Sequence, residues 1–123
     1  MQCLAAAADR LSPKGRLVIE AMAGVPEEYR ASTGLGVGET GPEPVVLNVS
    51  RHDPVRQRVV VHRLGIEDGS IRLGTMALRY AWPAEIDLMA RLAGLSLVER
   101  RGGWRGEEFT ADSSTHVSVY ETD

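Results

Sequence analysis

The stretch RYAWPAEIDLMARLAGLSLVER, residues 79–100, decides the fold, because it contains the signals for both ends of a helix and then the start of a strand. Pro83 suits the first helical position, where a missing N–H costs nothing and φ is already set. Glu85 places negative charge near the helix start, where the macrodipole favours it. Gly94 stands where a left-handed residue ends a helix. The stretch predicts a helix over 83–93, whose apolar stripe is formed by Ile86, Met89, Leu92 and Ala93.

A strand follows this helix almost at once. Leu95, Leu97 and Val98 predict a mostly buried strand over 95–100. A helix that leads through a short connection into a buried strand is half of a βαβ unit, so the stretch indicates an α/β protein. The rest of the chain must then supply the sheet.

The residues before this unit fall into three segments. The alanine-rich segment 2–11 predicts a helix, and SPKG at 12–15 ends it. The strand predicted over 16–22 contains a continuous apolar run, which is typical of a strand covered on both faces, as in a parallel sheet. Segment 23–44 is rich in glycine and proline and predicts a mobile loop.

The hydrophobic pattern changes to a period of two after residue 44. Three strands are predicted, over 45–50, 56–63 and 71–80, and EDGS at 67–70 is a hairpin signal. Because their connections are short, these strands should form an antiparallel three-stranded meander. A polar loop over 102–114 and a closing strand over 116–122 complete the chain.

Composition limits the class of protein. The 123 residues suffice for a single domain, 1–123, with 43% apolar residues and one Phe, so the core must be aliphatic. The formal charge of −3 argues against nucleic-acid binding. The sequence contains no run of about 18 apolar residues, so no membrane span is predicted. Cys3 is the only cysteine, which fits a reducing compartment, and the N-terminal residues do not resemble a signal peptide. We therefore expect a soluble cytoplasmic protein.

Glycines alternate with apolar residues in GLGVG, residues 34–38, which superficially resembles a cofactor-binding loop. Such a loop needs a strand before it and a helix after it. The polar segment 27–30 precedes it, and Pro42 and Pro44 follow it. A flexible surface loop is the better interpretation.

The densest polar cluster is RHDP at 51–54, followed by Arg56, Gln57 and Arg58. It fits a substrate-pocket wall, an anion site or a solvated strand edge, and the residues alone leave these open. His52, His62 and His116 lack the close pairing of metal ligands, so no metal site is predicted.

Two further groups have a chemical and a structural interpretation. Asp112, Ser113, Ser114 and His116 resemble a triad in composition, but they share one loop with no strained elbow, so no catalytic residue is assigned. Tyr80, Trp82 and Trp104 are the aromatic residues most suited to line a pocket, because such rings combine an apolar body with a polar edge. They could equally seal the ends of the core.

The order of these elements resembles the C-terminal half of a class I S-adenosylmethionine-dependent methyltransferase, and most of all the actinobacterial small-molecule enzymes of the sugar N,N-dimethyltransferase type, which belong to secondary metabolism. Four stretches carry the resemblance: LSPKGRLVIE at 11–20, LNVSRHDP with QRV at 47–59, RYAWP with the following helix at 79–95, and GGW, FT and HVSVY within 102–120. Together they cover nearly the whole chain.

The resemblance implies a fold and a site. Residues 1–22 and 81–123 would form part of the Rossmann-like methyltransferase sheet, and 45–80 an antiparallel insertion on the substrate side. The closing strand would lie antiparallel between strands 95–100 and 16–22. The substrate-binding residues implied are Arg51, His52, Tyr80, Trp82 and Trp104.

The resemblance also implies what these residues do not contain. In the family, the cofactor binds a glycine-rich turn after the first strand and an acidic residue ending the second, and both belong to the N-terminal half. We therefore expect no S-adenosylmethionine binding by this chain alone. Strand 16–22 would lose a neighbour on one side, and its unpaired edge predicts a C₂ homodimer or pairing with a complementary N-terminal half.

Three functions follow as hypotheses. The chain could be a methyltransferase-like protein that is inactive alone, a non-enzymatic module that binds a small molecule or a partner, or one half of a split methyltransferase. The methyl acceptor is not indicated by any residue pattern.

Overall fold

The computed structural model describes residues 2–40 and 45–122 and divides into two compact units. The first unit comprises the chain up to Gly24 and from Ala81 onward, and the second comprises Val25–Tyr80. The second unit is thus an insertion between the two halves of the first, joined to it by two chain crossings.

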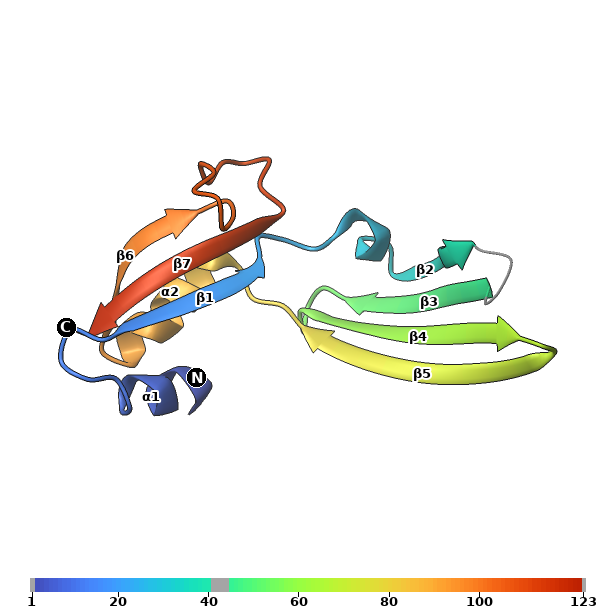
Figure 1. The fold of residues 1–123 in the computed structure, drawn as a ribbon, viewed down its shortest axis with the longest axis horizontal. Coiled ribbons are helices and arrows are strands. Elements are labelled where there is room, and N and C mark those ends of the chain that lie inside the picture. The colour runs from blue at the N-terminus through green and yellow to red at the C-terminus, as the bar shows by residue number, and fades with distance from the viewer. Residues whose placement is uncertain (1, 41–44, 123) are drawn as a thin grey trace. The chain divides into compact units, whose positions relative to one another are not determined.

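The first unit is a three-stranded sheet with helices. Its elements are α1 (Gln2–Ala8), β1 (Arg16–Met22), α2 (Pro83–Leu92), β6 (Leu95–Arg101) and β7 (Thr115–Thr122). The strand order is β1-β7-β6, and β7 runs antiparallel to both neighbours (Figure 1). This confirms the closing strand between strands 16–22 and 95–100. The loop predicted over 102–114 is confirmed, because β6 ends at Arg101 and β7 begins at Thr115.

Helix α2 begins and ends where the sequence predicts. Pro83 takes the first helical position and Gly94, with φ of 73°, follows the C-cap residue Ala93. Ile86 and Ala90 are buried and pack with two further buried side chains, Leu95 of β6 and Tyr120 of β7.

Two predictions of burial in this unit are wrong. Leu92 is 66% exposed, because Ile86 and Ala90 define the buried side of α2 and Leu92 lies beside it. Leu97 and Val98 are also exposed, because the β6–β7 register shifts between Leu97 and Glu99. Such a bulge turns side chains of an edge strand away from the core.

Strand β1 is covered on one face only, which corrects the prediction of a strand buried on both faces. Leu17, Ile19 and Ala21 pack against the core, whereas Val18 between them is exposed. Within the described residues, β1 pairs with β7 alone and all pairing in the unit is antiparallel. The continuous apolar run therefore does not distinguish a strand with one covered face from a strand with two.

The second unit is an antiparallel sheet of four strands in sequential order: β2 (Thr33–Thr40), β3 (Val45–Asp53), β4 (Arg58–Glu67) and β5 (Ser70–Arg79). The predicted meander is confirmed. Asp68 and Gly69 both have positive φ in the β4–β5 turn, as a two-residue hairpin of type I′ requires.

The predicted loop over 23–44 is wrong where strand β2 lies, and with it the flexible interpretation of 34–38. A 3₁₀ turn, η1 (Glu27–Tyr29), and strand β2 lie there, while residues 41–44 of this segment lie outside the described residues. Leu35 and Val37 alternate with glycines, which is the two-residue period of a strand that has no side chains on its other face. Gly38 approaches β3 so closely that a Cβ atom there would lie 3.0 Å from Val46. Glycine thus allows close strand contact here instead of flexibility.

Candidate functional site

The turn between β3 and β4 orders one end of the four-stranded sheet. The Asp53 carboxylate accepts hydrogen bonds from the backbone N–H of Arg56, at 3.0 Å, and from its guanidinium, at 2.9 Å. These bonds lower the pKa of Asp53 below its ordinary value. The turn closes on Gln57, which adopts a positive φ of 51°, and the Gln57 carbonyl accepts a bond from the Tyr80 N–H. The end of the sheet is therefore held by its own polar groups.

His52 and Tyr80 form a pair at this end. His52 Nε2 lies 2.9 Å from the Tyr80 hydroxyl, and the ring centroids are 5.7 Å apart. The His52 backbone N–H donates to the Ser32 carbonyl, which ties β3 to the segment before β2. Tyr80 is buried, while His52 is partly open. An imidazole bonded to a phenol can give or accept a hydrogen bond according to its tautomer, so the pair suits a polar ligand group.

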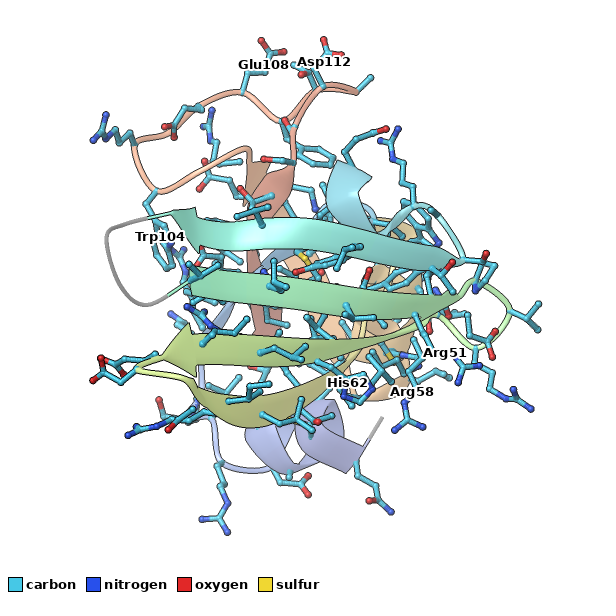
Figure 2. The ribbon with its side chains drawn as sticks, turned by 90° about the vertical axis from the view of Figure 1, so that its right-hand side faces the viewer. Arg51, Arg58, His62, Trp104, Glu108 and Asp112 are labelled. Carbon is cyan, nitrogen blue, oxygen red and sulfur yellow. The ribbon has the colours of Figure 1, made fainter. Side chains whose placement is uncertain are left out.

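Cationic side chains surround a shallow concavity of about 420 Å³ beside this pair. It is lined by Arg51, His52, Asp53, Arg56, Arg58, Val60 and His62. Figure 2 shows Arg51, Arg58 and His62 gathered toward one end of the sheet. Asp53 pairs with Arg56, and His62 Nδ1 lies 2.9 Å from the Thr75 hydroxyl. Within residues 2–40 and 45–122, Arg51 and Arg58 form no ion pair. Two uncompensated guanidinium groups favour an anionic or strongly polar ligand.

The two tryptophans belong to the first unit. Trp82 immediately precedes α2 and is about half exposed, and its ring packs on Gly24, where an added Cβ would lie 3.2 Å from Trp82 Cζ3. Trp104 lies in the loop after β6 and is 67% exposed, beside a concavity that includes Val117 and Val119. Of the five predicted substrate-binding residues, Arg51, His52 and Tyr80 thus lie in one unit, and Trp82 and Trp104 in the other.

A polar cluster in the first unit was missed by sequence reasoning. Asp87 of α2 accepts hydrogen bonds from Arg100, at 2.5 and 3.1 Å, and from the Tyr120 hydroxyl, at 2.6 Å. Arg100 also donates to Ser118, which in turn bonds His116 at 2.7 Å. The sequence signal for this cluster is the alternation of polar residues along the closing strand, which places residues 116, 118 and 120 on one face.

The groups of this cluster shift one another's pKa values. Burial raises the pKa of the Asp87 carboxyl, but the bonds from Arg100 and Tyr120 outweigh it and leave that pKa below its ordinary value. Burial and the bond to Asp87 raise the pKa of Tyr120 to about 12. Burial, together with nearby Arg100, lowers the pKa of His116. Asp87, Arg100 and Tyr120 thus form a hydrogen-bonded ionic network, and His116 lies at its margin.

His116 does not take part in a triad. Its Nδ1 contacts Ser118, its Nε2 has no hydrogen-bond partner among the described residues, and its ring meets Phe109 edge-on at 5.9 Å. Ser113 accepts a bond from the Thr110 N–H within the loop. Among the described residues no group of three or more His, Cys, Asp and Glu side chains could hold a metal ion.

Comparison with solved structures identifies the fold. The chain is similar to the CcbJ methyltransferase of Streptomyces caelestis, with 38% identity, a TM-score of 0.90, and coverage of 98% of this chain and 52% of that one. This is one half of a methyltransferase fold. The resemblance predicted from the sequence is confirmed. The sequence matches no protein-family model and no curated protein.

Two further structures support the methyltransferase-like fold. An S-adenosylmethionine-dependent methyltransferase from Clostridium acetobutylicum has a TM-score of 0.76 at 9% identity, with 97% of this chain and 49% of that chain covered. CalS10, an amino pentose methyltransferase from Micromonospora echinaspora, has a TM-score of 0.58 at 21% identity, with 98% and 49% covered. The methyltransferase-like chain therefore spans about half the length of the structures it matches. No helix among the described residues is long and apolar enough to cross a membrane.

Proposed function

We propose that these residues form the C-terminal, substrate-side half of an S-adenosylmethionine-dependent small-molecule methyltransferase. The likeness to CcbJ carries the proposal, because 38% identity extends over 98% of the chain and includes both units. On this proposal the first unit completes the methyltransferase sheet, and the inserted sheet holds the methyl acceptor.

The acceptor site lies at the turn end of the inserted sheet. His52 and Tyr80 provide a hydrogen-bonded pair whose phenol is buried and whose imidazole is partly exposed, with its Nδ1 3.5 Å from the Arg30 carbonyl oxygen. Arg51 and Arg58 provide positive charge with no ion-pair partner among the described residues. The two arginines are proposed to orient an acceptor by its anionic or polar groups. Trp82 and Trp104 of the first unit are proposed as further substrate-binding residues, since both rings expose much of their surface.

The described residues do not fit the methyl donor. A nucleotide-like cofactor on this class of fold needs a strand, a glycine-rich turn and a helix in succession. The glycines at 34, 36 and 38 instead lie within β2, which is followed along the sheet by another antiparallel strand. We therefore place the S-adenosylmethionine site in the half of the fold that these residues do not span.

Calorimetric titration with S-adenosylmethionine tests this proposal. The 123-residue chain alone should give no saturable heat, whereas its fusion to the complementary half of CcbJ should bind the donor with a stoichiometry of one. The complementary half without this chain is the control, and the fusion carrying R51A with R58A should keep donor binding while losing acceptor turnover. Saturable donor binding by the lone chain would refute the proposed division of the sites.

A binding module without catalysis is the second candidate. The concavity with two uncompensated arginines favours it independently of the donor, because such a site can bind an anion without any chemistry. If the fusion binds donor but transfers no methyl group to any small amine or hydroxyl acceptor, this candidate is preferred. A split methyltransferase would show the same donor binding when the two halves are mixed as separate chains.

A further inference from the structure

His116 of β7 is a buried titratable side chain with one ring nitrogen left without a partner. The residue is 0% exposed, and its Nε2 has no hydrogen-bond partner among the described residues. Its Nδ1 lies 2.7 Å from the Ser118 hydroxyl, which also accepts a bond from Arg100 Nε at 2.8 Å. Because that hydroxyl has one proton to give, it donates to Nδ1, and the neutral ring carries its own hydrogen on Nε2. A polar N–H is therefore enclosed without an acceptor.

The charges around this ring leave no anion for a second positive charge. The titratable and charged side chains near it are Arg100 of β6, Asp87 of α2 and Tyr120 of β7. Asp87 already accepts two bonds from Arg100, so these two charges compensate each other. From β1, Ala21 lies opposite His116, and Glu20 belongs to the other face of the sheet. A proton on His116 would therefore place an uncompensated charge in the interior.

Loop 102–114, between β6 and β7, covers this ring (Figure 1). The Phe109 ring meets the His116 ring edge-on, with centroids 5.9 Å apart, and the Arg100 guanidinium carbon lies 5.7 Å from the Phe109 centroid. The carboxylates of the loop, at 107, 108 and 112, are exposed to solvent. The loop thus contributes an aromatic ring, and no buried negative charge, to the surroundings of His116.

The same loop also reaches the other face of β7. Because side chains alternate along a strand, Val117 and Val119 lie on the face opposite His116. Trp104 lines a concavity of about 350 Å³ together with these two valines. The loop therefore places Phe109 on one face of β7 and Trp104 on the other, and a movement of the loop changes both faces.

We propose that loop 102–114 is a pH-sensitive lid, which is closed over His116 while this side chain is neutral and opens when it binds a proton. Opening moves Phe109 away from the ring, so that water can hydrate the imidazolium and bond to Nε2. A buried charged group without a partner is far less stable than a hydrated one, which supplies the driving force. Opening also removes Trp104 from the concavity that it lines. The lid does not depend on the proposed function.

The direction of the pH effect follows from these surroundings. Burial, together with Arg100, lowers the pKa of His116 below 6.5 while the lid is closed. Stability that arises from a lowered pKa is complete above pH 6.5 and is lost as pH falls through the lowered value. The ratio of closed to open lids should therefore fall about tenfold for each pH unit below 6.5, until the pKa of the closed state is reached. The pKa of Asp87 lies below its ordinary value of 3.8, so its bonds to Arg100 persist in this range.

Native-state amide exchange of the full chain tests the lid. It is measured by NMR at pH 7.5 and 5.5, with increasing urea below the unfolding midpoint. The reporters are the N–H groups of Gly102 and Ser113, which donate to the carbonyls of Glu107 and Thr110. Their protection factors should fall about tenfold at pH 5.5 and should not depend on urea, because a local opening exposes little surface. The amides of α2 should instead exchange with a clear dependence on urea, as in unfolding of a whole unit.

Three variants assign the effect to the pair of rings. H116Q should abolish the pH dependence of the reporters, and F109A should give low protection at both pH values. W104A is the matched control, because it removes an aromatic ring of the same loop on the other face of β7, and it should keep the pH dependence. The comparison of the wild-type chain with F109A keeps the test decisive if H116Q does not fold.

Several outcomes would overturn the lid. One is equal protection of the reporters at pH 7.5 and 5.5 in the wild-type chain. Another is reporter exchange with the same urea dependence as α2, which would mean that the loop opens only when the unit unfolds. A pH dependence that persists in H116Q, or that is lost in W104A and kept in F109A, would likewise contradict the role of His116 and Phe109.

Discussion

Replacing Asp87 by alanine should destabilise the first unit strongly. The carboxylate accepts two bonds from Arg100 and one from Tyr120. Removing it leaves Arg100, whose side chain is 14% exposed, with only neutral partners. Breaking a fully buried ion pair costs about 3–5 kcal/mol, and an exposed pair contributes less than about 1 kcal/mol. Because Asp87 itself is 27% exposed, we expect a loss of about 3 kcal/mol in the free energy of unfolding.

Urea unfolding followed by circular dichroism at fixed protein concentration measures this loss. About 3 kcal/mol corresponds to a fall of about 10 °C in Tm for a chain of this size. The control is E99A, which breaks the ion pair between Glu99 and Arg101, two side chains that are each about half exposed. That variant should lose less than about 1 kcal/mol. Equal losses in the two variants would refute the argument that burial of the Asp87 network sets its contribution.

Three other changes follow from the same unit. The pKa of Tyr120 is raised from 10.0 to about 12, because the folded state favours the neutral phenol. The stability that this shift contributes is complete below pH 10 and is lost as pH rises toward 12. Y120F should therefore remove this loss of stability from unfolding curves measured at alkaline pH. The pKa of His116 is lowered from 6.5, so the unfolded chain binds the proton more tightly than the folded chain. The urea concentration at the unfolding midpoint should therefore fall as pH drops below about 6.5. H116Q should make this midpoint less dependent on pH. G94A forces a Cβ into φ of 73° and should cost about 1 kcal/mol in urea unfolding, whereas G36A, with no atom within 4 Å of the added Cβ, should cost less.

Local signals explain why much of the fold could be predicted. Pro83 and Gly94 fix the ends of α2 through backbone geometry, which depends on no distant residue. The turn at Asp68-Gly69 likewise fixes the β4–β5 register. The position of β7 between β1 and β6 came from the family resemblance, since strand order depends on contacts that no local pattern contains.

Tertiary contacts explain what the sequence did not predict. The glycine- and proline-rich composition of 23–44 predicts a loop, yet Gly38 is needed where β2 approaches Val46. The partnership of Asp87 with Arg100 joins a helix to a strand, and the spacing between them carries no periodic signal. The same limit applies to the site: Arg51 and His52 could be selected as a polar cluster, but the hydrogen bond between His52 and Tyr80 required the folded sheet.

Alternation of apolar and polar residues does not show by itself which face of the inserted sheet is buried. A half-buried strand in a sheet normally alternates apolar with polar residues. In β4, however, Val59 and Val61 alternate with Val60, His62 and Leu64, so both faces are largely apolar. One face is buried in this chain and the other is open. A sequence that is apolar on both faces thus predicts two covering surfaces, and the chain supplies one of them.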